Sequence, residues 1–396
     1  MNSLENNIHI DVNCQQINHE GERICGDVFV SKKIEQENRI ICVLSDGMGH
    51  GVKANMLATL TATMAVNFAK EHKEPTKIAE IIMKTLPVCS VRQISYSTFT
   101  IIDIEIGGRV SILEYDNPQC TIFRGSEIFD PGWQCLLLEE GKNKKELLYT
   151  SFIPQKEDRI LFWSDGIAQS GLGSEKYPFG WGVNDAVKFI QEKIIKDPII
   201  SARKLSVLSV NKAFQNDLYH AKDDTSTACI YFREPRKLLL STGPPIRKSS
   251  DKELANIVRN FPGRKVIAGG TTADIIAREF KVKIVDSLDF DDPDLPPESH
   301  MDGIDLVTEG ILTLSKVANI LKNYNSDHDL GDGPADKMVK MFIRSDEIHI
   351  LVGTKINIAH QDPTLPVELE IRRTVAKRIA RLLDQKFLKG GSVKFI

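Results

Sequence analysis

Acidic residues stand at the ends of apolar runs at four places in the first 230 residues. Asp46 follows the run 41–44 and is followed by glycines at 47, 49 and 51, and Asp165 repeats this order in Ser-Asp-Gly after 160–163. Asp27 lies beside another apolar stretch, and the pair Asp223 and Asp224 comes just before the run 227–232. Because short apolar runs of this kind are typical of buried strands, we expect these carboxylates at strand ends and turns.

Carboxylates that converge from separate strands repel one another unless cations neutralise them. Oxygen ligands are typical of Mg2+ or Mn2+ rather than Zn2+, and glycines beside them let the backbone come close to an ion. A single Asp in such a turn is better explained by an Asx turn or a helix cap. Four occurrences together favour a site for a hard divalent cation.

The order of these motifs resembles the metal-dependent type-2C serine/threonine protein phosphatases, in the bacterial branch typified by stage II sporulation protein E. The resemblance covers residues 1–235 and rests on a Gly-Asp motif, an Asp-Gly-Met-Gly-x-Gly motif, a Ser-Asp-Gly motif and a final Asp-Asp-x-Ser/Thr motif. In this sequence they are Gly26 and Asp27, Asp46 to Gly51, Ser164 to Gly166, and Asp223 to Ser226. The tract 96–105 is also similar to the family's central strand.

The resemblance implies that two Mn2+ or Mg2+ ions are held by six residues. These are Asp27, Asp46, Gly47 through its carbonyl oxygen, Asp165, Asp223 and, at the metal or directly behind it, Asp224. The carboxylates of Asp27, Asp46 and Asp165 are expected to be the catalytic ones, because they would hold the ions that activate a bridging water for attack on a phosphate ester.

Two neighbouring residues are predicted not to take part. Arg23 does not have the spacing of the phosphate-gripping Arg of eukaryotic relatives, so a solvated surface position is expected. His50 lies inside the glycine turn and is interpreted as a spacer.

The elements expected around these motifs form an α+β domain. We predict strands near 9–16, 24–31, 39–46, 96–106, 109–117, 120–126, 159–164 and 226–232, and helices near 52–70, 76–86, 183–194 and 200–217. Two antiparallel sheets with helices on both outer faces, a four-layer αββα sandwich, fit this order, and the resembling family has that architecture.

The pattern changes near 233–237, and a second, smaller α/β layered domain is predicted for 236–396. Its strands are expected near 237–241, 265–270, 281–285, 347–353 and 392–396, alternating with helices near 250–260, 272–280, 305–323, 335–344 and 366–388. Such alternation is typical of a parallel or mixed sheet. We interpret this domain as regulatory or sensory.

One turn of the second domain is a candidate ligand site. Gly269, Gly270, Thr271 and Thr272 lie between a strand and a helix, where free backbone N–H groups suit a small anionic ligand. The alternative is that Thr271 or Thr272 simply caps the helix.

Composition limits the classes of protein. A net charge of −3 gives no electrostatic footprint for nucleic acid, and no apolar stretch reaches the length of about 18 residues that a membrane span needs. The first residues lack the basic and apolar regions of a signal peptide, and the seven cysteines are scattered without a CxxC pair. We therefore expect a cytoplasmic protein with reduced cysteines and no membrane contact.

The predicted function is the hydrolysis of phosphoserine or phosphothreonine on a bacterial regulatory protein. The alternative is a catalytically silent phosphatase fold that signals by binding a partner or ligand. Retention of Asp27, Asp46, Asp165 and Asp223 argues against this alternative, because buried charges without partners are costly to keep.

Overall fold

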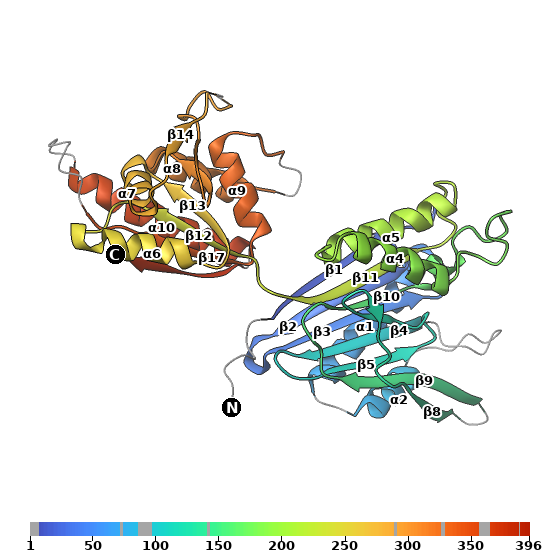
Figure 1. The fold of residues 1–396 in the computed structure, drawn as a ribbon. Helices are drawn as coiled ribbons and strands as arrows, with labels where there is room; N and C mark the ends of the chain where they lie inside the picture. Colours follow the sequence, from blue (N-terminus) through green and yellow to red (C-terminus); the bar gives the residue numbers. More distant parts are fainter. Residues whose placement is uncertain are drawn as a thin grey trace. The chain divides into compact units, whose positions relative to one another are not determined.

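The computed structural model describes residues 8–71, 74–85, 97–140, 143–288, 291–325, 329–355, 365–387 and 389–396. The chain divides into two compact units, Met1–Glu234 and Pro235–Ile396. Figure 1 shows that each unit contains both helices and strands. The described strands form three sheets. Each unit is described by itself below.

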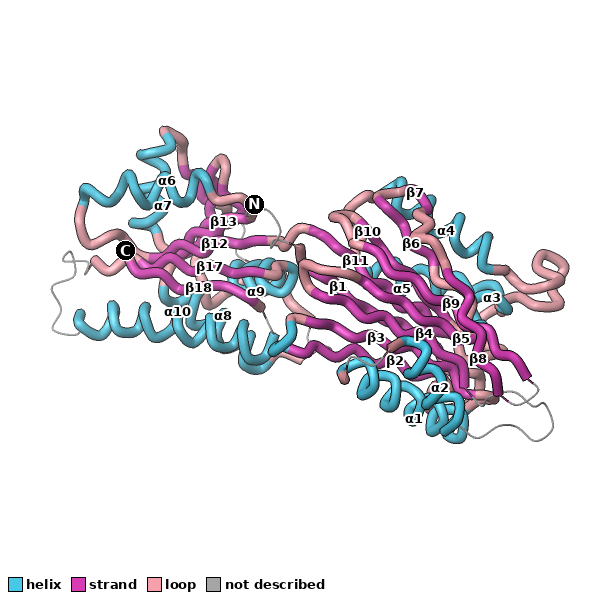
Figure 2. The backbone as a smooth tube through the Cα atoms, turned by 90° about the horizontal axis from the view of Figure 1, so that it is seen from below, coloured by secondary structure: helices cyan, strands magenta, loops and turns pink. Residues whose placement is uncertain are grey.

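The first unit contains two antiparallel sheets (Figure 2). The six-stranded sheet has the order β2 (Asp27–Ile34), β3 (Arg39–Gly47), β4 (Ser97–Glu105), β5 (Val110–Tyr115), β9 (Asn143–Phe152), β8 (Gln134–Glu140). The five-stranded sheet has the order β1 (His9–Ile17), β11 (Thr225–Arg233), β10 (Asp158–Trp163), β6 (Thr121–Arg124), β7 (Glu127–Ile128). All neighbouring strands in both sheets run antiparallel.

Three hydrophobic cores hold these sheets and their helices together. One lies between the six-stranded sheet and the helices α1 (Gly51–Lys70) and α2 (Pro75–Thr85). A second lies between the five-stranded sheet and the helices α3 (Asp165–Gln169), α4 (Val183–Lys196) and α5 (Ala202–Asn216). The third lies between the two sheets themselves, where Leu44 and Ile102 share a cluster with Phe162 and Ile230.

Strand β11 shows why the central strands are continuously apolar in sequence. All of its residues are buried. Ala228, Ile230 and Phe232 belong to the core between the sheets, whereas Cys229 and Tyr231 belong to the core under the helices. Because successive side chains of a strand point to opposite faces, a segment covered on both faces has apolar residues at consecutive positions, as 228–232 does, rather than at alternate ones.

Helix α1 packs closely because its buried face is made of small residues. Ala54, Ala58, Ala62 and Ala65 are fully buried and follow helical spacing. Small side chains let the helix backbone approach the sheet, so the turn that leads into α1 is held tightly against the end of β3.

The second unit contains one mixed sheet of seven strands. The central strand β12 (Lys237–Thr242) is parallel to β13 (Arg264–Ala268) and to β17 (Glu347–Val352). The parallel part continues with β16 (Ile304–Thr308) beside β13 and β18 (Gly390–Phe395) beside β17. Beyond β16, the strands β15 (Ser299–Met301) and β14 (Ile284–Asp286) pair antiparallel.

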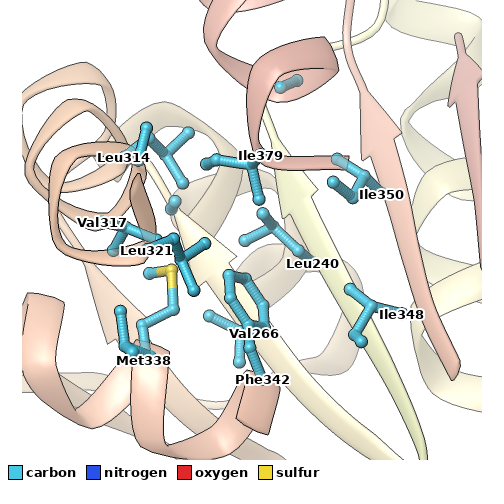
Figure 3. Packing of buried hydrophobic residues seen from close by; sticks show 14 of the residues in the cluster. Leu240, Val266, Leu314, Val317, Leu321, Met338, Phe342, Ile348, Ile350 and Ile379 are labelled. Carbon is cyan, nitrogen blue, oxygen red and sulfur yellow. The ribbon is translucent and has the colours of Figure 1, made fainter. Parts of the chain in front are cut away.

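Helices cover both faces of this sheet. α6 (Asp251–Asn260) and α7 (Gly270–Phe280) contribute to one core, and α8 (Ile311–Asn323), α9 (Pro334–Arg344) and α10 (Leu365–Phe387) contribute to the other. Figure 3 shows side chains of α8, α9 and α10 meeting those of β12, β13 and β17 in the second of these cores. The short 3-10 helices Glu35–Glu37 and Lys248–Ser250 complete the described elements. None of the helices in the described residues is long and apolar enough to cross a bilayer.

Two predictions about elements were wrong. The helix expected over 305–323 begins only at Ile311, because 304–308 is strand β16. Leu306 and Val307 are buried in the two opposite cores of the sheet, so tertiary burial on both faces decides for a strand there.

The second error is a set of omissions, because no strands were expected at β7, over the hairpin of β8 and β9 or at β15, and a turn rather than the helix α3 was expected after Asp165. The segment 143–146 reads Asn-Lys-Lys-Glu, and β8 forms the edge of its sheet. The short apolar run 135–138 is thus bounded by charged residues, which are common in edge strands and weaken the local strand signal.

The division into compact units makes a prediction about folding. A chain truncated after Glu234 should be soluble and unfold cooperatively, because its three cores are complete without later residues. Circular dichroism and calorimetry of the pieces 1–234 and 235–396 test this. An insoluble 1–234 piece, or one without a cooperative transition, would show that the two units need each other to fold.

Candidate functional site

The pairing of β2 with β3 brings two of the predicted carboxylates together. Asp27 is the first residue of β2 and lies directly opposite Asp46 of β3 in the antiparallel ladder. Directly opposed residues project from the same face of a sheet. Gly47, the last residue of β3, pairs with Ser97 at the same end of the sheet.

The five-stranded sheet supplies the other predicted carboxylates. Asp165 begins α3, two residues after β10 ends at Trp163. Asp223 and Asp224 come directly before β11, which is the antiparallel neighbour of β10. The end of β10 and the start of β11 therefore present these acidic residues at one end of their sheet.

Hydrogen bonds connect the acidic ends of the two sheets. Ser226 Oγ of β11 donates to Asp27 Oδ2 over 2.6 Å. Gln16 Nε2 of β1 donates to Ser226 Oγ over 3.0 Å and to the carbonyl oxygen of Asp27 over 3.2 Å. Ser164 Oγ accepts the backbone N–H of Ser226 at 2.9 Å. These contacts fix Asp27, on one sheet, against β11 of the other.

The proton affinities of the carboxylates show that they act on one another. The pKa of Asp27 is raised to about 7, mainly by burial. Hydrogen bonds with Ser226 and Ser164 lower this pKa, whereas the charges of Asp224 and Asp165 raise it. Burial also raises the pKa of Asp223 to about 6, and the charge of Asp165 adds to this effect.

Asp46 is affected in the same way. Burial raises its pKa well above the ordinary value, followed in effect by the charges of Asp27, Asp165 and Asp223. Burial likewise raises the pKa of Asp165, although a hydrogen bond with the carboxyl group of Asp46 lowers it. Asp46 at the end of β3 and Asp165 at the start of α3 thus lie close enough for each to change the pKa of the other. We refer to Asp27, Asp46, Asp165, Asp223 and Asp224 as the acidic cluster.

Two oxygens of the acidic cluster are buried without a hydrogen-bond partner, Asp27 Oδ1 and Asp224 Oδ2. The other oxygen of Asp224 accepts the backbone N–H of His19 at 3.0 Å. A buried acceptor without a donor costs free energy, and a cation removes that cost. The orphaned oxygens therefore indicate where positive charge would be bound most favourably.

Glycines are required around the acidic cluster because the backbone is crowded there. A Cβ at Gly26 would lie 2.6 Å from Asp224 Oδ2, and one at Gly166 would lie 2.3 Å from the carbonyl oxygen of Asp224. A Cβ at Gly47 would lie 2.0 Å from the carbonyl oxygen of Ala54 in α1. Larger residues at these positions would push the acidic strand ends apart.

The residues present fit a hard divalent cation. The donors are oxygens, two of them are orphaned, and the carboxylates are held together in spite of their charges. However, the described residues contain no group of three or more His, Cys, Asp or Glu side chains already arranged to hold a metal ion. The ligands are therefore gathered, but not set in a formed coordination shell.

Several residues near the acidic cluster were not predicted from the sequence. Asp116 lies just after β5 and has a positive φ of 57°. Its charge is one of the causes that raise the pKa of Asp165. It follows an apolar run as Asp46 does, and that signal was available in the sequence. The roles of Gln16 and His19 had no such signal, because they depend on strand pairing.

The two residues expected to be bystanders both lie at the surface. Arg23 is exposed. His50 is exposed as well, stacks on the ring of His19 with centroids 4.3 Å apart, and contacts Glu22 Oε1 through Nδ1 at 2.8 Å.

Comparison with known proteins identifies the first unit. Residues 36–230 match the family model of stage II sporulation protein E. A curated relative, the phosphoserine phosphatase RsbX of Bacillus subtilis (strain 168), is 38% identical over 74 residues, which are 19% of this chain and 36% of the relative. The chain thus spans about a third of the length of that relative.

Solved structures with a similar fold include the phosphatase domain of the cell fate determinant SpoIIE from Bacillus subtilis. Its TM-score is 0.42 at 14% sequence identity, and the match covers 58% of this chain and 94% of that chain. RsbX in complex with magnesium gives a TM-score of 0.39 at 21% identity over 57% of this chain and 96% of that chain. The motif resemblance is confirmed by the family match: the segment 36–230 of this chain belongs to the stage II sporulation protein E family of type-2C phosphatase domains.

Proposed function

We propose that this chain is a metal-dependent serine/threonine phosphoprotein phosphatase. The observation that carries the proposal is the acidic cluster itself, in which Asp27 and Asp46 from one sheet meet Asp165 and Asp223 from the other. A family match over 36–230 and the name of the curated relative, a phosphoserine phosphatase, support the same activity.

The proposed scaffold is the four-layer αββα sandwich. Its support is the succession of three cores, from helices to sheet, from sheet to sheet, and from sheet to helices. In this arrangement the acidic cluster lies at one end of the core between the sheets, where residues of both sheets reach it.

Two Mg2+ or Mn2+ ions are proposed to bind at the acidic cluster. Their ligands would be Asp27, Asp46, Asp165, Asp223 and the carbonyl oxygen of Gly47, with Asp224 beside them. Such ions, when bound, shield the charge of a phosphate ester and lower the pKa of a water that attacks it. The chain's own contribution is to hold the carboxylates in place. Ser226 and Gln16 fix Asp27 for this role through the hydrogen bonds described above.

The electrostatics of the acidic cluster make a cation necessary for this function. A phosphate monoester is itself an anion and would be repelled by the carboxylates alone. The same reasoning weighs against the silent scaffold, the second candidate. A protein that only binds a partner gains nothing from orphaned buried carboxylate oxygens, which lower its stability.

A protein is the proposed substrate because an apolar surface adjoins the acidic cluster. Val52, Met56 and Leu60 are 58%, 66% and 45% exposed and follow one another at helical spacing on α1. Helix α1 begins at Gly51, directly after the loop that leaves Gly47. We infer that this stripe docks a phosphorylated regulatory protein while its phosphoserine or phosphothreonine reaches the acidic cluster. A location in the cytoplasm stays a prediction.

The first prediction concerns activity. Asp46→Asn and Asp165→Asn should each lower the release of phosphate from a phosphoserine peptide by on the order of 10²-fold or more, because each removes a charge that holds the cations. The matched control is Asp185→Asn on α4, an exposed carboxylate whose described ion pair is with Lys188. Wild-type activity should need added Mn2+ or Mg2+. Full turnover in excess EDTA, or in either cluster variant, would contradict the proposal.

The second prediction concerns stability against pH. A carboxyl group whose pKa is raised by folding binds its proton more tightly in the folded chain than in the unfolded chain. Its contribution to stability is complete below the unfolded pKa of about 4 and is lost as the pH rises through the folded values. Those values are about 7 for Asp27 and about 6 for Asp223.

In EDTA, the Tm of the first unit should therefore fall between about pH 5 and pH 8, by roughly 2–4 °C for each kcal/mol lost. Mg2+ or Mn2+ at pH 8 should restore it, and Asp27→Asn should flatten the pH dependence relative to Asp185→Asn. Differential scanning calorimetry checks this. A Tm that is constant or rises over this range in EDTA would show that the carboxylates do not oppose one another.

A further inference from the structure

The second unit has a cavity at the carboxyl ends of its parallel strands. The cavity has a volume of about 520 Å³ and is lined by the residues that follow β12, β13 and β16. From β12, the chain adds β13 and β16 on one side of the sheet and then β17 and β18 on the other. In open parallel sheets, ligands bind outside the carboxyl ends of the strands, near the point where the strand order reverses.

The start of α7 forms one wall of this cavity. Strand β13 ends at Ala268, and Gly269 turns with a φ of +129° into the first residue of α7, Gly270. The N-cap residue of α7 is Gly269, and Thr271 and Thr272 lie inside the helix, so the alternative that one of them is the cap is wrong. The first backbone N–H groups of a helix lack partners within the helix, and their dipole favours negative charge.

Two buried hydroxyl groups on the same wall are without partners. Thr242 and Thr272 line the cavity and are each 1% exposed, and the Oγ1 atoms of both lack a hydrogen-bond partner. An unsatisfied buried hydroxyl is costly, and two of them beside one cavity mark a place where an acceptor would be favourable. This observation is independent of the helix terminus and points to the same place.

The charged residues of the cavity favour an anion near α7. Arg372 of α10 lines the cavity beside the turn after β12, since a Cβ at Gly243 would lie 2.8 Å from Arg372 Nη1. Glu309 also lines the cavity, but its Oε2 accepts the backbone N–H of Leu312, in the first turn of α8, at 3.1 Å. The start of α8 is therefore already paired with a carboxylate, whereas the start of α7 is not.

We propose that this cavity binds the phosphoryl group of a small phosphorylated metabolite. The N–H groups that open α7, the hydroxyls of Thr242 and Thr272, and the guanidinium of Arg372 are all donors, and phosphoryl oxygens accept hydrogen bonds from several donors at once. A volume of about 520 Å³ leaves room for the organic part of the ligand as well. The cavity lies outside the segment 36–230, so this inference does not depend on the proposed phosphatase activity.

Isothermal titration calorimetry of the full chain tests the proposal. The probes are inorganic phosphate and adenosine 5′-monophosphate, with acetate and adenosine as the matched compounds that lack a phosphoryl group. Excess EDTA keeps cations from the acidic cluster, so that phosphate is not bound there. Both phosphoryl probes should bind saturably with a stoichiometry of about one, and neither matched compound should bind comparably.

Variants locate the binding. A Cβ at Gly270 would meet no atom within 4 Å, so Gly270→Val places a side chain in open space beside the cavity without straining the fold. Arg372→Gln removes the guanidinium charge. Each should weaken phosphate binding by about tenfold or more, which corresponds to about 1.4 kcal/mol. The control is Arg264→Gln, which removes an exposed Arg at the amino end of β13 and should leave binding unchanged.

The melting temperatures of the variants show whether each is folded. Saturable binding that is lost in both cavity variants and kept in the control supports the site. The proposal is overturned if neither phosphoryl probe binds to the wild-type chain, or if folded Gly270→Val and Arg372→Gln bind phosphate with wild-type affinity. Equal binding of acetate would show a general anion site and overturn the assignment to a phosphoryl group.

Discussion

Mutual repulsion of buried carboxylates is the constraint on which the first unit depends. Asp27 and Asp46 are opposed in one sheet, and Asp165 and Asp223 stand at the neighbouring ends of two strands in the other. Burial and mutual repulsion both raise the pKa values of these carboxyl groups. The cluster is therefore energetically favourable only when protons or cations reduce its negative charge. A fold that keeps such a cluster together must obtain its stability elsewhere.

That stability comes from packing that does not involve the acidic residues. Strands β10 and β11, beside which Asp165, Asp223 and Asp224 lie, are buried along their whole length. The alanine face of α1 presses the turn after Gly47 against the sheet, and Ser226 and Gln16 tie the two sheets together at the acidic end. The carboxylates are thereby held by strands that cannot separate without exposing two cores.

The second unit gathers the opposite kind of group. Parallel strands followed by helices place helix N-termini at one edge of the sheet, and there the chain presents N–H groups, hydroxyls and Arg372. In the first unit the acidic residues stand at strand ends and at the start of α3, and they present carboxylate oxygens. The donor groups at the proposed site of the second unit thus suit an anion, and the carboxylates of the first unit suit a cation.

Features that depend on a few neighbouring residues could be predicted from the sequence alone. The acidic residues after apolar runs, the glycines beside them and the family to which 36–230 belongs were all visible there, as were central strands such as β11 and the helix α7. These features depend on a few consecutive residues, because burial on both faces demands a continuous apolar run and a tight turn demands glycine.

Only the tertiary structure decided the features that depend on partners far away in the chain. In the hairpin of β8 and β9, the apolar run 135–138 is followed by the charged segment 139–146, and the two strands are fixed by pairing with each other. The segment 304–308 became a strand because two cores require Leu306 and Val307 on opposite faces. Likewise, the pairing of β1 with β11 brings Gln16 into contact with Asp27. Thr242 and Thr272 line the same cavity because β12 lies beside β13. Local sequence contains no information on such pairings, since the free energy that selects them is gained only when distant strands come together.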